Sequence, residues 1–228
     1  MNRRLVPVAG SPFLAQRLVI FFGSAWLLIS WILVIGLKRP MMPTTETWLP
    51  GVRLMLIMAA IGLVVVWPMA AMASSQPLSP RRTLRETSLL LVTAQLITWP
   101  AGLVTAWTLP RTALIAITLT GWGLLAGAAA AWGRCHVRVG WRLGMMACCL
   151  LMLLAAPIFL SFDEAATWAE GYSPLTSLWS MAGDGLAAPT TGEWIAAGSP
   201  WVIAIVAWCL IAAAGSCDVG SKTGTSQT

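Results

Sequence analysis

The feature that most constrains this sequence is a succession of apolar runs, each about 20 residues long and almost free of charged side chains. Of the 228 residues, 58% are hydrophobic and only 10% are charged. A soluble domain carries about 25% charged residues, because its surface must face water. The outer surface of this chain must therefore face an apolar medium, and a lipid bilayer is the medium that fits.

A helix needs about 20 apolar residues to cross a hydrocarbon core roughly 30 Å thick. On this criterion the sequence predicts an all-α fold, a polytopic bundle of six transmembrane helices. The expected spans cover residues 18–37, 54–72, 88–109, 113–132, 143–162 and 195–215. They form one transmembrane domain at residues 18–215. A cytoplasmic amphipathic lead-in at residues 1–17 precedes it, and a disordered Gly/Ser/Thr-rich tail at residues 216–228 follows.

Several of the expected spans contain a proline, and two of these prolines bear on helix shape. Pro68 is near the end of the second span, and Pro100 is near the middle of the third. Helices in lipid tolerate proline when neighbouring groups satisfy the freed carbonyls, so these residues indicate either kinked packing or hinges. Pro110 and Arg111 form a very short junction between the third and fourth spans, which predicts a tight helical hairpin.

The basic residues set the expected orientation. With the N-terminus inside, ten of the 14 Lys and Arg residues fall in cytoplasmic segments and the other four in outer segments. Six of the eight acidic residues fall outside. This positive-inside bias predicts that both termini lie in the cytoplasm and that the chain resides in the plasma (inner) membrane.

The longest segment between spans, from Ser161 to Pro200, contains recurring tryptophans and leucines. Tryptophan favours the boundary between membrane and water, so the pattern predicts short helices that lie at the outer interface or re-enter the membrane before the last span. The expected outer-interface anchors are Trp168, Trp179, Trp194 and Trp201. Several of the other tryptophans lie deeper in the spans, where they can line a lipid-accessible cavity or simply fill volume.

A pair of glycines marks a packing face in the fourth span. Gly123 and Gly127 are four residues apart, and such a GxxxG pattern lets the backbone of another helix approach closely. The pattern predicts tight helix packing without naming the partner.

The same sequence disfavours several kinds of chemistry. No acidic or basic residue lies deep within an expected span, which argues against proton- or ion-coupled transport. One histidine cannot supply two haem ligands, and the five cysteines show no CxxC spacing. We therefore expect no catalytic, cofactor-binding or metal-binding residue and no enzyme activity. The outer carboxylates Asp163 and Glu164 leave a membrane-embedded enzyme as a minor alternative.

The basic residues form short clusters between apolar runs, which is a pattern of membrane topology rather than of nucleic-acid binding.

Three short motifs carry a family resemblance. Residues 11–14 read Ser-Pro-Phe-Leu, residues 79–86 read Ser-Pro-Arg-Arg-Thr-Leu-Arg-Glu, and residues 172–176 read Tyr-Ser-Pro-Leu-Thr. The layout resembles the permease subunits of ABC-2-type transporters, which have a lead-in helix, a basic coupling segment between spans two and three, and re-entrant helices before span six. That family's usual coupling signature has an acidic residue and a glycine followed by Thr-Leu-Glu. This chain keeps Thr83 and Leu84, but it has no glycine there, and its glutamate is displaced to Glu86.

The resemblance implies a permease-like subunit of an ATP-driven transporter that moves an apolar or lipid-like cargo. No GxxxxGK[ST] motif is present, so a separate cytoplasmic ATPase would have to dock, with Arg82, Arg85 and Glu86 as the candidate contacts. The chain would also form a homo-oligomer or pair with other membrane subunits. The alternative function is that of a non-catalytic accessory or structural subunit of a larger multi-subunit membrane complex.

Overall fold

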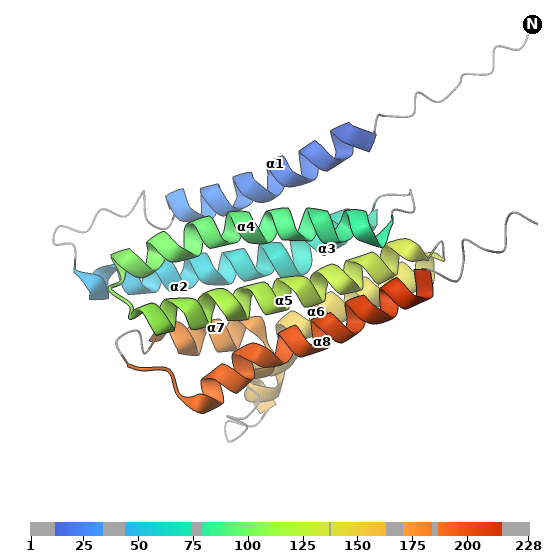
Figure 1. Ribbon diagram of the computed structural model, residues 1–228. Helices are drawn as coiled ribbons and strands as arrows, with labels where there is room; N and C mark the ends of the chain where they lie inside the picture. The colour runs from blue at the N-terminus through green and yellow to red at the C-terminus, as the bar shows by residue number, and fades with distance from the viewer. Residues whose placement is uncertain are drawn as a thin grey trace, which may run out of the picture.

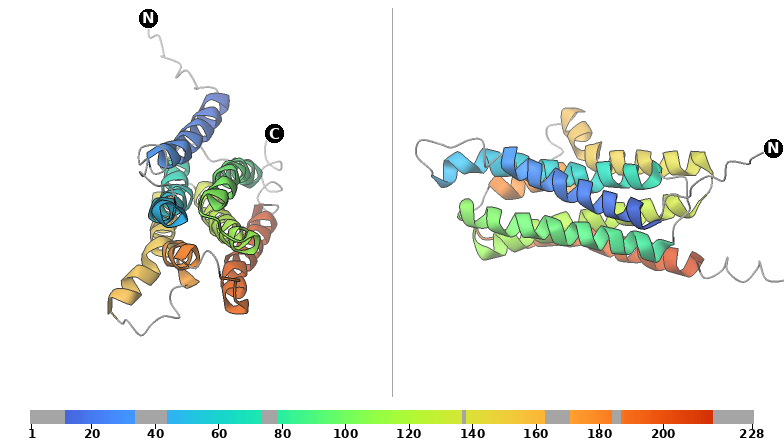
Figure 2. Two further views of the ribbon diagram at one scale, coloured as in Figure 1. Left: turned by 90° about the vertical axis from the view of Figure 1, so that its left-hand side faces the viewer. Right: turned by 90° about the horizontal axis from the view of Figure 1, so that it is seen from above.

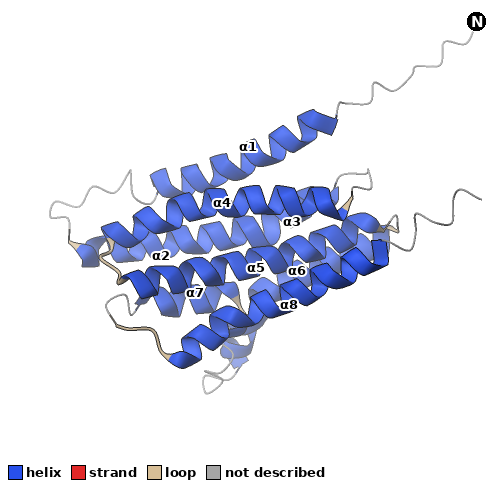
Figure 3. Ribbon diagram, viewed as in Figure 1, coloured by secondary structure: helices blue, strands red, loops and turns tan. Residues whose placement is uncertain are grey.

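The computed structural model of the protein describes residues 12–33, 44–73, 79–136, 138–162, 171–183 and 187–215. These residues form helices and no strand (Figure 3). In chain order the helices are α1 (Pro12–Trp31), α2 (Thr45–Ile61), a π-helical segment (Gly62–Val66), α3 (Trp67–Ala73), α4 (Pro80–Val104), α5 (Leu109–Cys135), α6 (Val139–Phe162), α7 (Pro174–Gly183) and α8 (Thr191–Gly215).

Five helical stretches are long and apolar enough to cross a membrane: Glu46–Ala73, Pro80–Val104, Leu109–Cys135, Val139–Phe162 and Thr191–Ala214. The prediction of an all-helical, multi-pass membrane bundle is confirmed at this level. The expected first span overlaps α1, but its last four residues lie outside the described ranges, as do residues 1–11 of the lead-in and the tail at residues 216–228.

The long helices lie side by side and point alternately in opposite directions (Figure 1). One end of the bundle is where α1, α4 and α6 begin and where α5 and α8 end. We call it the arginine-rich end, because its described basic residues include Arg81, Arg82, Arg85, Arg134, Arg138 and Arg142. The opposite end, where α2, α5 and α8 begin, contains Arg53 and Arg111.

Helix α5 is the centre of the bundle. Of its most apolar 18-residue window, 78% is buried, against 17% for α6 and 22% for α8. Helices α4, α6, α7 and α8 all contact it, whereas α1 and α6 lie at the periphery when the bundle is seen end-on (Figure 2, left). Its sequence is rich in glycine and alanine, and small residues let neighbouring backbones approach closely.

Two glycines bring α4 against α5 in an antiparallel pair. A side chain at Gly123 would lie 2.6 Å from Leu91, and one at Gly127 would lie 2.7 Å from Thr87. Further along the same face, Gln95 of α4 donates hydrogen bonds to the carbonyl of Ala116 and the hydroxyl of Thr120 in α5, at 3.2 and 2.7 Å. The Gly123–Gly127 face therefore packs against α4.

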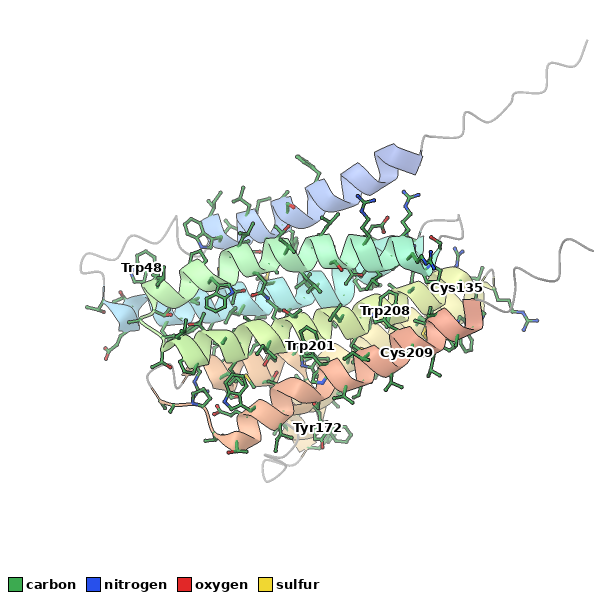
Figure 4. All side chains as sticks on the ribbon, in the orientation of Figure 1. Trp48, Cys135, Tyr172, Trp201, Trp208 and Cys209 are labelled. Atoms are coloured by element: carbon green, nitrogen blue, oxygen red, sulfur yellow. The ribbon has the colours of Figure 1, made fainter. Side chains whose placement is uncertain are left out.

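Two tryptophans join α8 to α5. The indole N–H of Trp201 donates to the Ile117 carbonyl at 2.9 Å, and that of Trp208 donates to the Leu124 carbonyl at 3.2 Å. Both the donors and the acceptors are seven residues apart, so the two helices run parallel in constant register. Figure 4 shows both indoles on the side of α8 that faces α5.

The small residues of the acceptor helix make these contacts possible. A helical side chain covers the carbonyl about one turn before it, so a small residue leaves that carbonyl open. Gly121 and Ala128 stand four residues after the two acceptor carbonyls in α5. The same arrangement recurs between α1 and α2, where Trp26 donates to the Met58 carbonyl at 2.9 Å and its ring packs on Gly62. These three part-buried tryptophans thus satisfy their N–H groups without a polar side chain as partner.

The π-helical segment precedes Pro68, which is the second residue of α3. In a regular α-helix the proline ring would clash with the carbonyl of Val64. The wider π-turn, in which the Trp67 N–H bonds to the Gly62 carbonyl, accommodates the ring inside a continuous helix. The predicted bend near Pro68 is therefore a local widening of the helix just before the proline.

The hairpin between α4 and α5 turns earlier than the sequence predicts. Ala106 adopts a left-handed conformation, with φ of 52°, and the Trp107 N–H bonds to the Gly102 carbonyl at 3.1 Å. This is a Schellman ending, which stops α4 at Val104. Pro110 and Arg111 then fall in the first turn of α5, where proline is favoured, rather than in the link itself.

Replacing Gly127 by alanine tests the close approach of α4 and α5. The new methyl group would overlap Thr87, whose β-branched side chain is stiff and already bonded to the Thr83 carbonyl. We expect a loss of about 1–3 kcal/mol in stability, measured by unfolding in detergent micelles. Gly144→Ala is the control, because nothing lies within 4 Å of that position and alanine favours helix. Equal stability of the two variants would contradict the packing described.

Candidate functional site

A buried ionic cluster joins the start of α4 to the end of α5. The Glu86 carboxylate is 1% exposed and accepts a hydrogen bond from Arg134, which is 3% exposed, at 2.9 Å. Arg82 approaches the other carboxylate oxygen at 3.3 Å. Arg134 also donates to the hydroxyl of Thr83 at 3.2 Å. Hydrogen bonds between guanidinium and carboxylate groups are stronger than those between neutral groups.

Local sequence explains how α4 contributes to this cluster. Arg82 and Glu86 are four residues apart and therefore lie on one face of the helix. Thr87, next to Glu86, contacts Gly127 of α5, so the two backbones are close one or two turns before Arg134. The arginine side chain can then reach Glu86 only because no bulky residue separates the helices.

This geometry corrects the expectation for Glu86. The sequence predicts that its carboxylate contacts a partner protein, but the group is inside the bundle and paired within the chain. Arg82 is partly buried by the same pairing. Of the three predicted contacts, Arg85 alone is exposed, and Arg81 is exposed beside it. The available surface at the start of α4 is therefore basic.

A second, part-buried ion pair lies at the opposite end of the bundle. Arg111, 1% exposed, binds the carboxylate of Glu193 in the first turn of α8 and the carbonyl of Ala187. The other oxygen of Glu193 accepts from the N–H of Thr190 at 2.7 Å, and the Glu193 N–H bonds to the Thr190 hydroxyl. Glu193 thus caps α8 and ties its start to α5.

The four predicted outer-interface anchors have different environments. Trp179 is 49% exposed and Trp194 is 38% exposed, both in the half of the bundle near the opposite end. Trp168 lies outside the described residues. Trp201 has a packing role that the sequence did not predict, because its ring packs on Gly121 and its N–H is bonded to α5. Heptad spacing with Trp208 was the sequence signal for this role.

Helix α7 is a short, largely buried helix before the last span. Its ten residues give it a length of about 15 Å, half of a hydrocarbon core. It packs against α2, α5 and α6. Pro157 of α6 has no N–H, which frees the Leu153 carbonyl, and the buried Ser173 hydroxyl donates to that carbonyl at 2.6 Å. The start of α7 is thereby fixed to the proline site of α6.

Within the described residues, no group of three or more His, Cys, Asp or Glu side chains could hold a metal ion. The carboxylates Asp163 and Glu164 fall outside those residues. His136, the single histidine, is exposed, and its ring lies between Trp132 and Trp141, with centroids at 6.4 and 5.0 Å. The described part of the chain therefore offers charged clusters at its two ends and an apolar interior.

No protein-family model matches this chain, and neither the curated proteins nor the solved structures include a significant match.

Removal of Glu86 tests the inner cluster. Glu86→Ala leaves Arg134 buried without its charge partner, which costs about 3–5 kcal/mol in comparable cases. We expect a large drop in thermal stability in micelles. The double variant Glu86→Leu/Arg134→Met removes both charges and should recover most of the loss. Glu46→Ala, at an exposed position, is the control for loss of a carboxylate. A Glu86→Ala protein as stable as that control would contradict the cluster's role.

Proposed function

We propose that this chain is a permease-like subunit of an ATP-driven transporter and that a separate cytoplasmic ATPase docks on the arginine-rich end. The observation that carries the proposal is the cluster of Arg82, Glu86 and Arg134. It fixes the first turns of α4 to the last turn of α5. A partner that pulls or pushes on the start of α4 would therefore move the central helix as well.

The charges around the cluster support a docking role. Arg81 and Arg85 are exposed on α4, and Leu84 between them is 39% exposed. A basic surface with an apolar residue at its centre suits an acidic partner surface, because complementary charge increases the rate and specificity of association. Glu86 contributes indirectly, by holding the helix that presents these residues.

The interior supports an apolar or lipid-like cargo. The described acidic and basic residues of the spans lie towards the helix ends, and the middles contain apolar, small and hydroxyl side chains. Ion- and proton-coupled transport uses charged groups inside the membrane. A cargo that needs no charge partner fits this interior better than an ion does.

The proposal includes six spans with both termini inside. Helix α1 has 20 residues, a length of about 30 Å, which suffices for a sixth span. It begins at the end of the bundle where α8 finishes (Figure 1). That end is also the arginine-rich one, which the positive-inside rule assigns to the cytoplasm. In this arrangement α7 is the re-entrant helix, in the outer half of the membrane.

Charge reversal on α4 tests the docking surface. Arg81→Glu/Arg85→Glu should release the ATPase that co-purifies with the wild-type chain from its native membrane, because each change turns attraction into repulsion. The membrane domain should unfold at an unchanged temperature, since both side chains are exposed.

The matched control is Arg138→Glu, an exposed arginine at the same end but between α5 and α6. It carries a charge reversal of the same kind and should leave the ATPase bound. Impermeant thiol labelling of single cysteines checks that insertion is unchanged. If no ATPase co-purifies with the wild type, or if the Arg81→Glu/Arg85→Glu variant keeps it, the proposal is wrong. The accessory-subunit function would then take its place.

The accessory-subunit alternative is favoured by one observation, the exposed apolar face of α8. Val202, Val206 and Leu210 are more than half exposed, and Cys209 is exposed among them (Figure 4). Such a face suits another membrane subunit as well as lipid. A permease would also use it to pair with a second copy.

Oxidative cross-linking identifies the subunit at this face. In a variant that keeps Cys209 and replaces the other cysteines by serine, we expect a disulfide-linked homodimer in native membranes. Val92→Cys, 60% exposed on α4, in a background without native cysteines is the control for random collisions. A product with the mass of a different subunit would instead favour the accessory function.

A further inference from the structure

A groove opens between α2, α6 and α7, near the end of the bundle opposite to the arginine-rich one. It has a volume of about 310 Å³ and is lined by Ile57, Leu160, Leu175, Thr176, Trp179 and Ser180. This volume is at the lower end of the range of about 300–1,000 Å³ for small-molecule sites.

The proline of α6 accounts for the groove. After Pro157 the last turns of α6 diverge from the bundle (Figure 2, right). Helix α7 enters the resulting space, and its start is bonded to the freed Leu153 carbonyl. The helix fills only part of the space, and Leu160 of α6 and Ile57 of α2 line the groove together with residues of α7.

The groove is apolar along its length. Its two hydroxyl groups bond to their own helix, Thr176 to the Ser173 carbonyl at 3.3 Å and Ser180 to the Ser177 carbonyl at 3.1 Å. The last turn of α6 beside it is strongly exposed, with Phe159 at 56% and Phe162 at 86%. Exposed aromatic residues at the end of a span face lipid, so the groove opens towards the bilayer.

A guanidinium group lies beside the groove. Arg53 is one helical turn before Ile57, and its guanidinium carbon is 4.9 Å from the ring centre of Trp179, a lining residue. Its Nε is buried without a hydrogen-bond partner, and no described carboxylate forms an ion pair with it. Arg111, the other described basic residue at this end, is paired with Glu193.

We propose that the groove binds one acyl chain of an anionic phospholipid from the surrounding bilayer, with the phosphate bound by Arg53. The apolar walls match the acyl chain. The half-buried Arg53 cation attracts the net negative charge of an anionic headgroup, which a zwitterionic headgroup lacks. Guanidinium binds phosphate by charge-assisted hydrogen bonds. A soluble anion would gain nothing from the groove, and an uncharged lipid would gain nothing from Arg53. This inference does not rest on transport, since the lipid needs no ATPase.

The experiment uses the full chain, purified in nonionic detergent without an ATPase. Binding of phosphatidylglycerol and of phosphatidylcholine is measured by native mass spectrometry and by the shift in unfolding temperature. We expect the wild type to prefer phosphatidylglycerol by about tenfold, the size of one charge-assisted hydrogen bond. Arg53→Gln should abolish the preference, whereas Arg81→Gln, an exposed arginine at the other end, should keep it.

A second pair of variants tests the acyl-chain site. Ser180→Phe fills the groove and should weaken binding of both lipids, while Ser199→Phe should not. Ser199 is an exposed serine on α8 that also bonds three residues back, to the Ala196 carbonyl at 2.9 Å.

Three results would overturn the proposal. The first is an undiminished preference in Arg53→Gln, and the second is wild-type lipid binding by Ser180→Phe. The third is an unfolding temperature of Arg53→Gln that falls below that of the wild type by the same amount without lipid as with it. Arg53 would then stabilise the fold itself rather than bind lipid. These measurements contain no ATPase, so a failure of the proposed docking of an ATPase would not change them.

Discussion

Close contact between α5 and its neighbours is the constraint on which the rest of the structure depends. In a bilayer, apolar side chains gain little by leaving lipid, so helices associate through close packing and through hydrogen bonds between helices. On one side of α5, Gly123 and Gly127 admit α4; on another, Gly121 and Ala128 leave backbone carbonyls open to the tryptophans of α8. Bulkier residues at these positions would separate the helices and remove both kinds of contact.

The charged groups follow from that closeness. Arg134 reaches Glu86 and Arg111 reaches Glu193, so each end of α5 has an ion pair, fully buried for Arg134 and Glu86 and part-buried for Arg111 and Glu193. Such pairs often add little stability compared with apolar residues, but a missing partner is costly, so they disfavour alternative helix registers. Helices α4 and α8 are therefore held to α5 at opposite ends. Helix α6 is more exposed, and its kinked end borders the groove with α7.

Part of the candidate site could be predicted from local sequence. The i,i+4 spacing of Arg82 and Glu86 and the proline-started helix at Pro80 are local signals, and they predict a charged helical segment correctly. The partner of Glu86 could not be predicted, because Arg134 is 48 residues away and looks like any loop arginine in the sequence. The packing role of Trp201 was missed for a similar reason. A tryptophan near a span end suits an interface, and only the facing carbonyl of α5 makes it a packing residue.

By itself the sequence determined that the chain forms long apolar helices and roughly where these lie, because length and hydropathy act locally. It did not determine the turn between α4 and α5, which comes several residues before the expected junction at Pro110. Only the tertiary structure decided which helix lies at the centre. In water, a buried helix face differs from an exposed one in polarity, so the pattern reveals it. In lipid both faces are apolar, and α5 and α6 are both apolar enough to span, with mean hydropathies of 1.8 and 2.5, although 78% of one window and 17% of the other is buried. The difference arises from shape, since small side chains permit contact and large ones fill the space against lipid.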